Sequence, residues 1–245
     1  MSKEWTELLI KSFQHQIHDV YTSIPCVIIN IKDINEQRVD VQPAINIITP
    51  EGDYKPHPPI LSVPVMFPST STSALTLEIN TGDEVLCTFS HRCIDLFKNQ
   101  GGIVNPIDLR KFDKRDAVAI VGLSSFSKAA NQPSRRTLAH NPRDVVLAHN
   151  IGTANEVEVR LGKDGSVSIT TTGKITINAD EAEVKANTVD ITASTSTVNG
   201  NLVVNGNIDS SGSITAPTIT GGGKSLSTHT HSGVESGGGT SGPPV

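Results

Sequence analysis

The second half of the chain alternates apolar and polar residues with a period of two. From Val157 to Ile219 the apolar positions carry Val, Ile and Leu with a few Ala, and the residues between them are mainly Thr, Ser, Asn, Asp and Lys. This period places every second side chain on one face of a β-strand. Turn-forming residues interrupt the alternation, for example Lys163-Asp164-Gly165 and Asn199-Gly200-Asn201. The segment therefore predicts many short strands in succession.

These strands lack the bulky side chains that a single chain needs to build a core. No Phe, Trp or Tyr follows Phe126 in the sequence. Burial of small aliphatic side chains alone does not offset the conformational entropy lost when so many residues become ordered. Association would bury a second face of each strand, and slim β-branched residues suit a narrow core near a symmetry axis. We predict an intertwined β-helical oligomer with trimeric symmetry; a monomeric parallel β-solenoid and a disordered Ser/Thr-rich tail are the alternatives.

The first half has an ordinary composition and predicts a different fold. Residues 3–21 carry apolar side chains at three- and four-residue spacing, which indicates an amphipathic helix. Turns are expected at 33–36 and 81–84. Short strands are expected at Cys26–Ile31, Arg38–Val41, Ile60–Met66, Val85–Phe89 and Ala117–Gly122. Five or six short strands within about 100 residues fit a small antiparallel barrel of the OB type.

The change of composition near residues 127–155 marks the predicted domain boundary. The predicted fold class is all-β, with an N-terminal OB-fold barrel, an intertwined trimeric β-helix and a short N-terminal helix. The expected parts are an attachment helix at 1–22, an OB-fold collar at 23–126, a connector at 127–155, a β-helical shaft at 156–220 and an apex at 221–245.

Charge, cysteines and motifs narrow the range of functions. The net charge is −5 at pH 7 and basic residues do not interleave with aromatic ones, so we expect no nucleic-acid partner. Three cysteines without zinc-ligand spacing indicate reduced thiols in a protein that folds in a cytosol. The sequence contains no evident signal peptide and no apolar run of membrane-spanning length. It also contains no nucleophile elbow or Walker loop, so we expect neither an enzyme nor a small-molecule substrate.

The candidate metal ligands are His229 and His231, close to the C-terminus. Residues i and i+2 of a strand point the same way, so one chain offers two neighbouring imidazoles. Three chains around an axis offer six, which form an octahedral shell that zinc disfavours. Such a closed shell leaves no position for water or substrate, and the predicted role is therefore a structural clip at a metal-capped apex. A chance pair or a partial expression tag is the alternative interpretation.

Four short motifs in the first half and one near the C-terminus carry a family resemblance. They are Val39-Asp40-Val41-Gln42-Pro43, Val63-Pro64-Val65, Gly82-Asp83-Glu84-Val85-Leu86, Arg92-Cys93-Ile94-Asp95 and Thr228-His229-Thr230-His231-Ser232-Gly233. Together with the Asn-Gly-Asn turns of the second half, they make the chain resemble the central baseplate spike of contractile-tailed bacteriophages. The resemblance is strongest to the short, enzyme-free membrane-piercing spikes.

The resemblance implies a homotrimer with one iron ion, bound by His229 and His231 of all three chains. It implies a spike that is assembled in the host cytoplasm, held at the tail baseplate of the virion by a hub protein, and driven through the host outer membrane by sheath contraction. A trimeric receptor-binding tail fibre tip or adhesin is the alternative function. A metalloenzyme that uses the histidine pair is a third.

Overall fold

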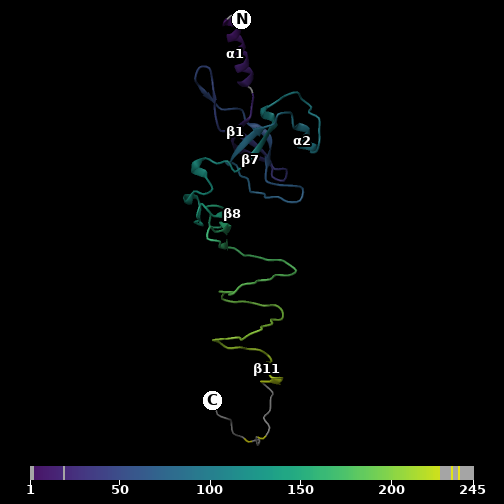
Figure 1. Ribbon diagram of the computed structural model, residues 1–245, viewed down its shortest axis with the longest axis vertical. Helices are drawn as coiled ribbons and strands as arrows, with labels where there is room; N and C mark the ends of the chain where they lie inside the picture. Colours follow the sequence, from purple (N-terminus) through teal and green to yellow (C-terminus); the bar gives the residue numbers. More distant parts are fainter. Residues whose placement is uncertain (1–2, 19, 227–232, 234–236, 238–245) are drawn as a thin grey trace. The chain divides into compact units, whose positions relative to one another are not determined.

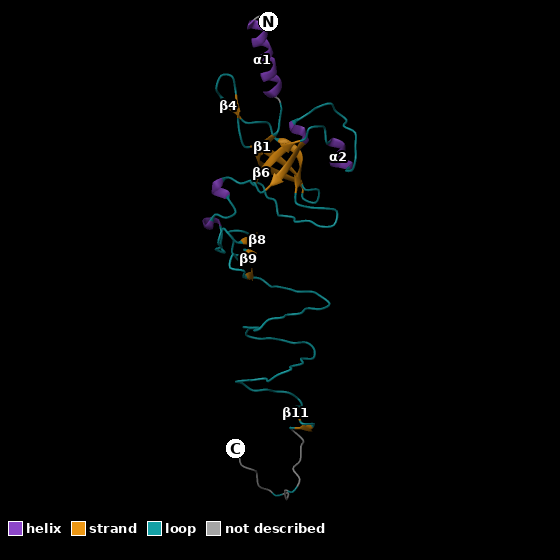
Figure 2. Cartoon of the chain, viewed as in Figure 1, coloured by secondary structure: helices purple, strands orange, loops and turns teal. Residues whose placement is uncertain are grey.

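The structure is a computed structural model that describes residues 3–18, 20–226, 233 and 237. The contacts within it divide the chain into two units, Met1–Asn178 and Ala179–Val245. Most helices and strands belong to the first unit, and the described part of the second contains a single short hairpin (Figures 1 and 2).

Five strands of the first unit close into a barrel (Figure 2, orange). The strands are β1 (Ser23–Asp33), β2 (Arg38–Pro43), β5 (Ile60–Met66), β6 (Glu84–Phe89) and β7 (Ala117–Val121). Their order is β1-β2-β5-β7-β6, and β6 pairs back with β1. All neighbouring pairs are antiparallel except β5 and β7, which are parallel. The barrel is OB-like, so the predicted collar fold is confirmed.

Every second side chain of the barrel strands points into the barrel interior and fills it. In β6, Val85, Cys87 and Phe89 are buried, whereas the residues between them are half-buried. The interior residues are small, β-branched or aromatic: Cys26, Ile28, Val39, Val41, Ile60, Val63, Val65, Phe67, Ile79, Val85, Cys87, Phe89, Ala117 and Ala119. All three cysteines of the chain are free and buried.

Local chemistry sets the predicted turns of the barrel. The Asp33 carboxylate accepts hydrogen bonds from the backbone N–H groups of Asn35 and Glu36, at 2.8 and 3.2 Å. Such bonds let a short polar side chain stabilise a turn. Gly82 has a φ of 97°, a conformation that residues with a Cβ adopt at a cost. Both turns are therefore confirmed.

The predicted N-terminal helix is also confirmed and is three residues shorter than expected. It is α1 (Lys3–His18), and Trp5, Leu8, Leu9, Ile10 and Phe13 are exposed on it. The side chains of Trp5, Leu8 and Phe13 lie on one stripe of the helix and are 63%, 63% and 62% exposed. This stripe is available to a binding partner.

Short elements occupy the barrel loops and the segment after the barrel. They are β3 (Ile47–Ile48), β4 (Tyr54–Lys55), α2 (Asp95–Gln100) and the 3-10 helices η1 (Lys114–Asp116), η2 (Phe126–Lys128) and η3 (Pro133–Arg135). Among the helices of the described residues, none combines the length and apolarity needed to cross a bilayer.

A three-stranded antiparallel sheet follows these loops, in the order β10-β9-β8. Its strands are β8 (Val145–His149), β9 (Val157–Leu161) and β10 (Val167–Thr170). The last two strands begin the predicted shaft, and β8 comes from the predicted connector. We call this element the neck sheet.

The chain from 171 to 219 contains no regular strand in the structure. The single chain therefore does not form the strands that were predicted around Ile175 and Ile191. A strand needs a neighbour to pair its backbone groups, and the single chain brings no neighbour to this segment. A hairpin of β11 (Thr220–Gly221) and β12 (Lys224–Ser225) follows (Figure 1). The predicted trimeric β-helix, which requires further chains, stays a prediction.

The barrel core can be tested with two adjacent isoleucines. Ile28 is 0% exposed and Ile29 is 42% exposed. Ile28→Ala leaves a cavity, so it should lower the free energy of unfolding by about 2–5 kcal/mol. Ile29→Ala should lower it by less than about 1 kcal/mol. Urea unfolding followed by circular dichroism measures both losses, and equal losses would contradict the assigned core.

Candidate functional site

The predicted metal ligands His229 and His231 lie outside the described residues. The last described element before them is the hairpin of β11 and β12. Its turn contains Gly222 and Gly223, with φ angles of 58° and 79°. The structure therefore leaves the predicted apex site as a prediction.

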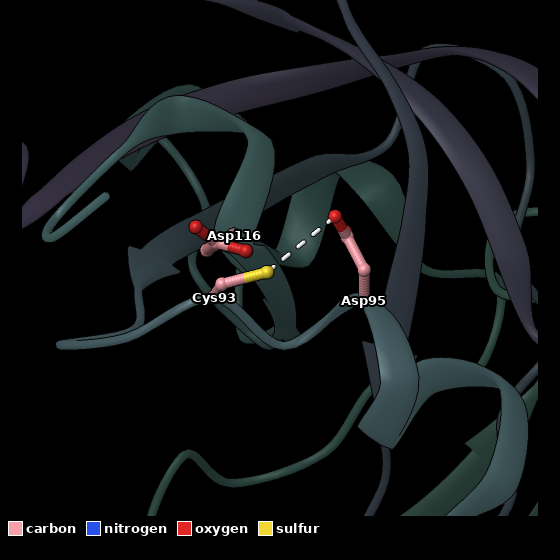
Figure 3. Close-up of side chains that lie close together, drawn as sticks. All are labelled: Cys93, Asp95 and Asp116. Carbon is pink, nitrogen blue, oxygen red and sulfur yellow. Dashed lines mark hydrogen bonds between the residues drawn. The ribbon is translucent and has the colours of Figure 1, made fainter. Parts of the chain in front are cut away.

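Within the described residues, one group of potential metal ligands comes together on the barrel. Figure 3 shows its members, Cys93, Asp95 and Asp116, whose ligand atoms lie within 4.8 Å of one another. Cys93 precedes α2, Asp95 begins it, and Asp116 ends η1. Cys93 and Asp116 are buried, and the Cys93 Sγ atom lies 3.5 Å from Asp95 Oδ2. In the sequence, Cys93 and Asp95 belong to a family motif, Cys93 is one of the three predicted reduced thiols, and no spacing connects them with Asp116.

Arg110 already occupies the carboxylates of this group. Its Nε and Nη2 atoms donate to Asp116 at 2.7 and 2.8 Å, and Nη2 also donates to Asp95 at 2.6 Å. The backbone N–H of Ile94 donates to Asp116 at 3.0 Å. Nη1 donates to Asp108 at 3.2 Å. Since the oxygens accept these bonds and the guanidinium supplies the positive charge, the geometry is that of an ion-pair network rather than a metal centre.

The network also favours the ionised form of its two half-buried acids, Asp95 and Asp108. Hydrogen bonds from the Arg110 side chain hold the pKa of Asp95 below its usual range. The backbone N–H of Arg110, followed by its side chain, lowers the pKa of Asp108. Both carboxylates are thus stabilised in the ionised form by the fold. The network ties α2, η1 and the intervening loop to the barrel.

An open groove of about 890 Å³ lies beside this network. Its charged lining residues are Arg38, Lys98, Arg110, Lys114 and Arg115 on the positive side, and Glu36 and Asp95 on the negative side. Much of this positive charge is already offset, because Arg110 pairs with Asp95, Asp108 and Asp116, Arg115 with Asp113, and Arg38 with Glu36. Lys98 and Lys114 add positive charge to the lining.

A second buried ion-pair network holds the neck sheet. The Glu156 carboxylate accepts backbone N–H bonds from Thr137, Leu138 and Gly152, at 2.6, 3.3 and 3.0 Å. Burial raises the pKa of Glu156, but these bonds and the nearby Arg136 lower it on balance. Arg136 lies 3.1 Å from Glu156 and 3.3 Å from Glu158. The side chain of Arg136 is only 3% exposed.

Sequence reasoning missed this second network. Glu156, Glu158 and Arg160 alternate with aliphatic residues, a pattern that ordinarily indicates a solvated strand face. Arg136, which turns this face into a buried one, lies twenty positions or more away in the sequence. The one local signal is that two acids and an arginine share a single strand face.

Arg110 provides a test of the first network. Arg110→Met leaves Asp116, which is 0% exposed, without its cation, so the free energy of unfolding should fall by roughly 3–5 kcal/mol. Arg115→Met is the control, because the Arg115 side chain is 59% exposed and its pair with Asp113 should contribute less than about 1 kcal/mol. Urea unfolding at neutral pH measures both. Equal losses would contradict a structural role for the network.

The same variant should change how stability depends on pH. Because the folded state lowers the pKa of Asp95 and Asp108, their contribution is present above the unfolded value of about 4 and is lost as the pH falls through the lower folded values. The wild type should therefore lose stability more steeply below about pH 4 than Arg110→Met does. Parallel curves would contradict this assignment.

Comparison with known proteins places these features in a family context. Residues 24–122 match the model of the phage protein Gp138 N-terminal domain, a range that spans the five barrel strands from the second residue of β1. Residues 225–245 match the GpV apex motif, a range that contains His229 and His231. A search of the curated proteins found no match.

The two matches agree with the resemblance drawn from the sequence motifs. The first covers the OB-like barrel, and the second covers the segment where the predicted metal ligands lie. Domains of this kind support a structural role in a phage tail spike and a location in the virion tail. The chain thus combines the N-terminal domain of a phage protein with an apex motif, a composition consistent with a phage baseplate spike protein.

Proposed function

We propose that three copies of this chain form a non-enzymatic spike at the tip of a contractile phage tail, which sheath contraction drives through the host outer membrane. One observation carries the proposal. A segment whose aliphatic side chains are exposed in the single chain leads into an apex motif. Ile177, Val184 and Ile191 are 78%, 76% and 75% exposed. Association around an axis would remove these side chains from water.

The mechanical role follows from the same association. Strands that pair around an axis satisfy their backbone hydrogen bonds between chains and leave no open edges. Such a closed shaft is stiff, and a narrow shaft concentrates the force of contraction on a small area of membrane. The energy comes from the sheath, so this chain needs no catalytic site.

The first half of the chain suits attachment. The exposed apolar stripe of α1 has the pattern by which amphipathic helices bind in the groove of a partner, and we assign that partner to the baseplate hub. The groove beside Arg110, which Lys98 and Lys114 line, offers a second contact on the barrel. The spike would then be held by its collar while its apex remains available to the envelope.

At the apex we propose one iron ion per trimer, held by His229 and His231 of each chain. Imidazole nitrogen is a good donor for iron, and six such donors fill an octahedral shell. When bound, the ion would supply a crosslink between three chain ends. The donor set of Cys93, Asp95 and Asp116 is less suitable, because Arg110 already occupies its carboxylates.

The assembly and the metal can be tested together on the purified protein. Light scattering should give about three times the 26.0 kDa chain mass, and elemental analysis should give about one iron per three chains. His229→Ala combined with His231→Ala should remove the metal and leave the trimer, since the aliphatic segment lies outside the apex. Cys93→Ser should keep the metal. A 26.0 kDa particle would contradict the trimer, and unchanged metal in the double histidine variant would contradict the site.

A comparison of phage adsorption with infection distinguishes a piercing function from a receptor-binding function. Phage particles that carry the double histidine variant should adsorb to host cells and contract as the wild type does, and fewer adsorbed particles should infect. Purified wild-type trimer added to cells beforehand should not reduce adsorption. Saturable inhibition of adsorption by the trimer would instead identify the chain as a receptor-binding fibre tip.

A further inference from the structure

The neck sheet has the reverse of the usual arrangement of an antiparallel sheet on a protein surface. Its strand register places two rows of three aliphatic residues on one face, which we call the aliphatic face: Val145, Leu161 and Val167 in one row, and Leu147, Val159 and Ile169 in the next. A sheet with one face in water ordinarily turns its polar side chains outward. Here the aliphatic residues point outward, with exposed fractions from 39% at Val159 to 69% at Val167.

The opposite face is mixed, with Val146 and Ala148 of β8 beside the charged residues of β9, and the chain itself covers its centre. Glu158 lies at its centre and is 2% exposed, because Arg136 from the connector pairs with it. The Nη2 atom of Arg160 donates to the carbonyl oxygen of Ala139 at 2.7 Å. The connector therefore covers the middle strand of this face, whereas Ser168 and Thr170 of β10 are exposed, as are all six residues of the aliphatic face.

We propose that the aliphatic face packs against the same face of two further copies, so that three neck sheets enclose a common core. This inference rests on the proposed trimer and identifies the surface that joins its chains. Its six residues are all aliphatic, so it offers a partner mainly apolar surface, and an identical face matches it. A third row on the same side of the sheet pairs His149 with Val157 at the end of the aliphatic face. A chain with a net charge of −5 repels its copies, and an uncharged face is where they can approach.

The sequence that follows β10 supports a copy of this chain as the occupant. The same alternation continues into the segment after the sheet, where Ile175 and Ile177 are 55% and 78% exposed. A partner that covered only the neck sheet would leave this continuation in water. Two further copies cover the neck sheet and its continuation by the same packing.

The neck sheet also differs from the shaft in how it would assemble. All three of its strands come from one chain and are already hydrogen-bonded to one another, whereas the segment 171–219 has no strand of its own. The neck sheets can therefore form from local contacts and then associate, before the shaft strands pair between chains. Association at this point would set the register of the three chains for the shaft.

Two adjacent residues of β10 make a matched test. Ile169 lies on the aliphatic face and Ser168 on the opposite face, and both are exposed in the single chain. If the single chain were the functional unit, aspartate at either position would be tolerated. We expect Ile169→Asp to reduce the particle mass to that of one chain at concentrations where the wild type is a trimer, and Ser168→Asp to leave the trimer intact. Light scattering measures the mass, and circular dichroism checks that the barrel remains folded.

A second measurement does not require the trimer to be broken. Thiols introduced by Ile169→Cys and Ser168→Cys can be alkylated with iodoacetamide, and the wild type gives the background of the three buried cysteines. The thiol on the aliphatic face should react at least tenfold more slowly. A trimer in both aspartate variants, or equal alkylation rates, would overturn the role of the neck sheet and leave the trimer standing. A monomeric wild type would instead overturn the proposed function.

Discussion

One copy of this chain cannot bury the aliphatic side chains of its second half, and the rest of the architecture depends on that constraint. The barrel buries its own apolar side chains, and Ile28, Val39 and Val63 are 0% exposed. Between residues 171 and 219 the large aliphatic side chains are exposed, for example 78% at Ile177 and 75% at Ile191. Burial of apolar surface is the main favourable term in folding, so the barrel can fold by itself, and the proposed association would supply this term to the second half.

Buried ion pairs fix the irregular segments that lie outside the hydrogen-bonded strands. Asp116 sits directly before β7 and is fixed by Arg110, and Glu158 lies in the middle of β9 and is fixed by Arg136. A buried pair adds little net stability, yet the loss of one partner is costly. Such networks therefore specify a conformation more than they stabilise it. In the neck sheet, the specified conformation is the one that turns the aliphatic face outward.

The sequence predicted those features that depend on local pattern. The barrel strands follow from alternation, as in Val85, Cys87 and Phe89, and the turns follow from Asp33 and Gly82. It did not predict the contacts of Arg110 and Arg136, because these join residues that no spacing rule connects. The predicted shaft strands required partners, and the single chain supplies none to 171–219. The histidine pair could be found from its spacing, and its geometry lies beyond the described residues.

The two halves of the proposed trimer interface would be held by different forces, for a reason that the composition supplies. The neck sheet and shaft carry aliphatic residues that can pack around an axis, so apolar burial can join three chains there. From Ser227 to Val245 the apolar side chains are Val234, Pro243, Pro244 and Val245, and most of the other residues are glycine, serine and threonine. Apolar burial cannot hold such an end together. Coordination of one ion by imidazoles concentrates the attraction in a few atoms and needs almost no core, which makes a metal clip the form of crosslink that a narrow apex can accommodate.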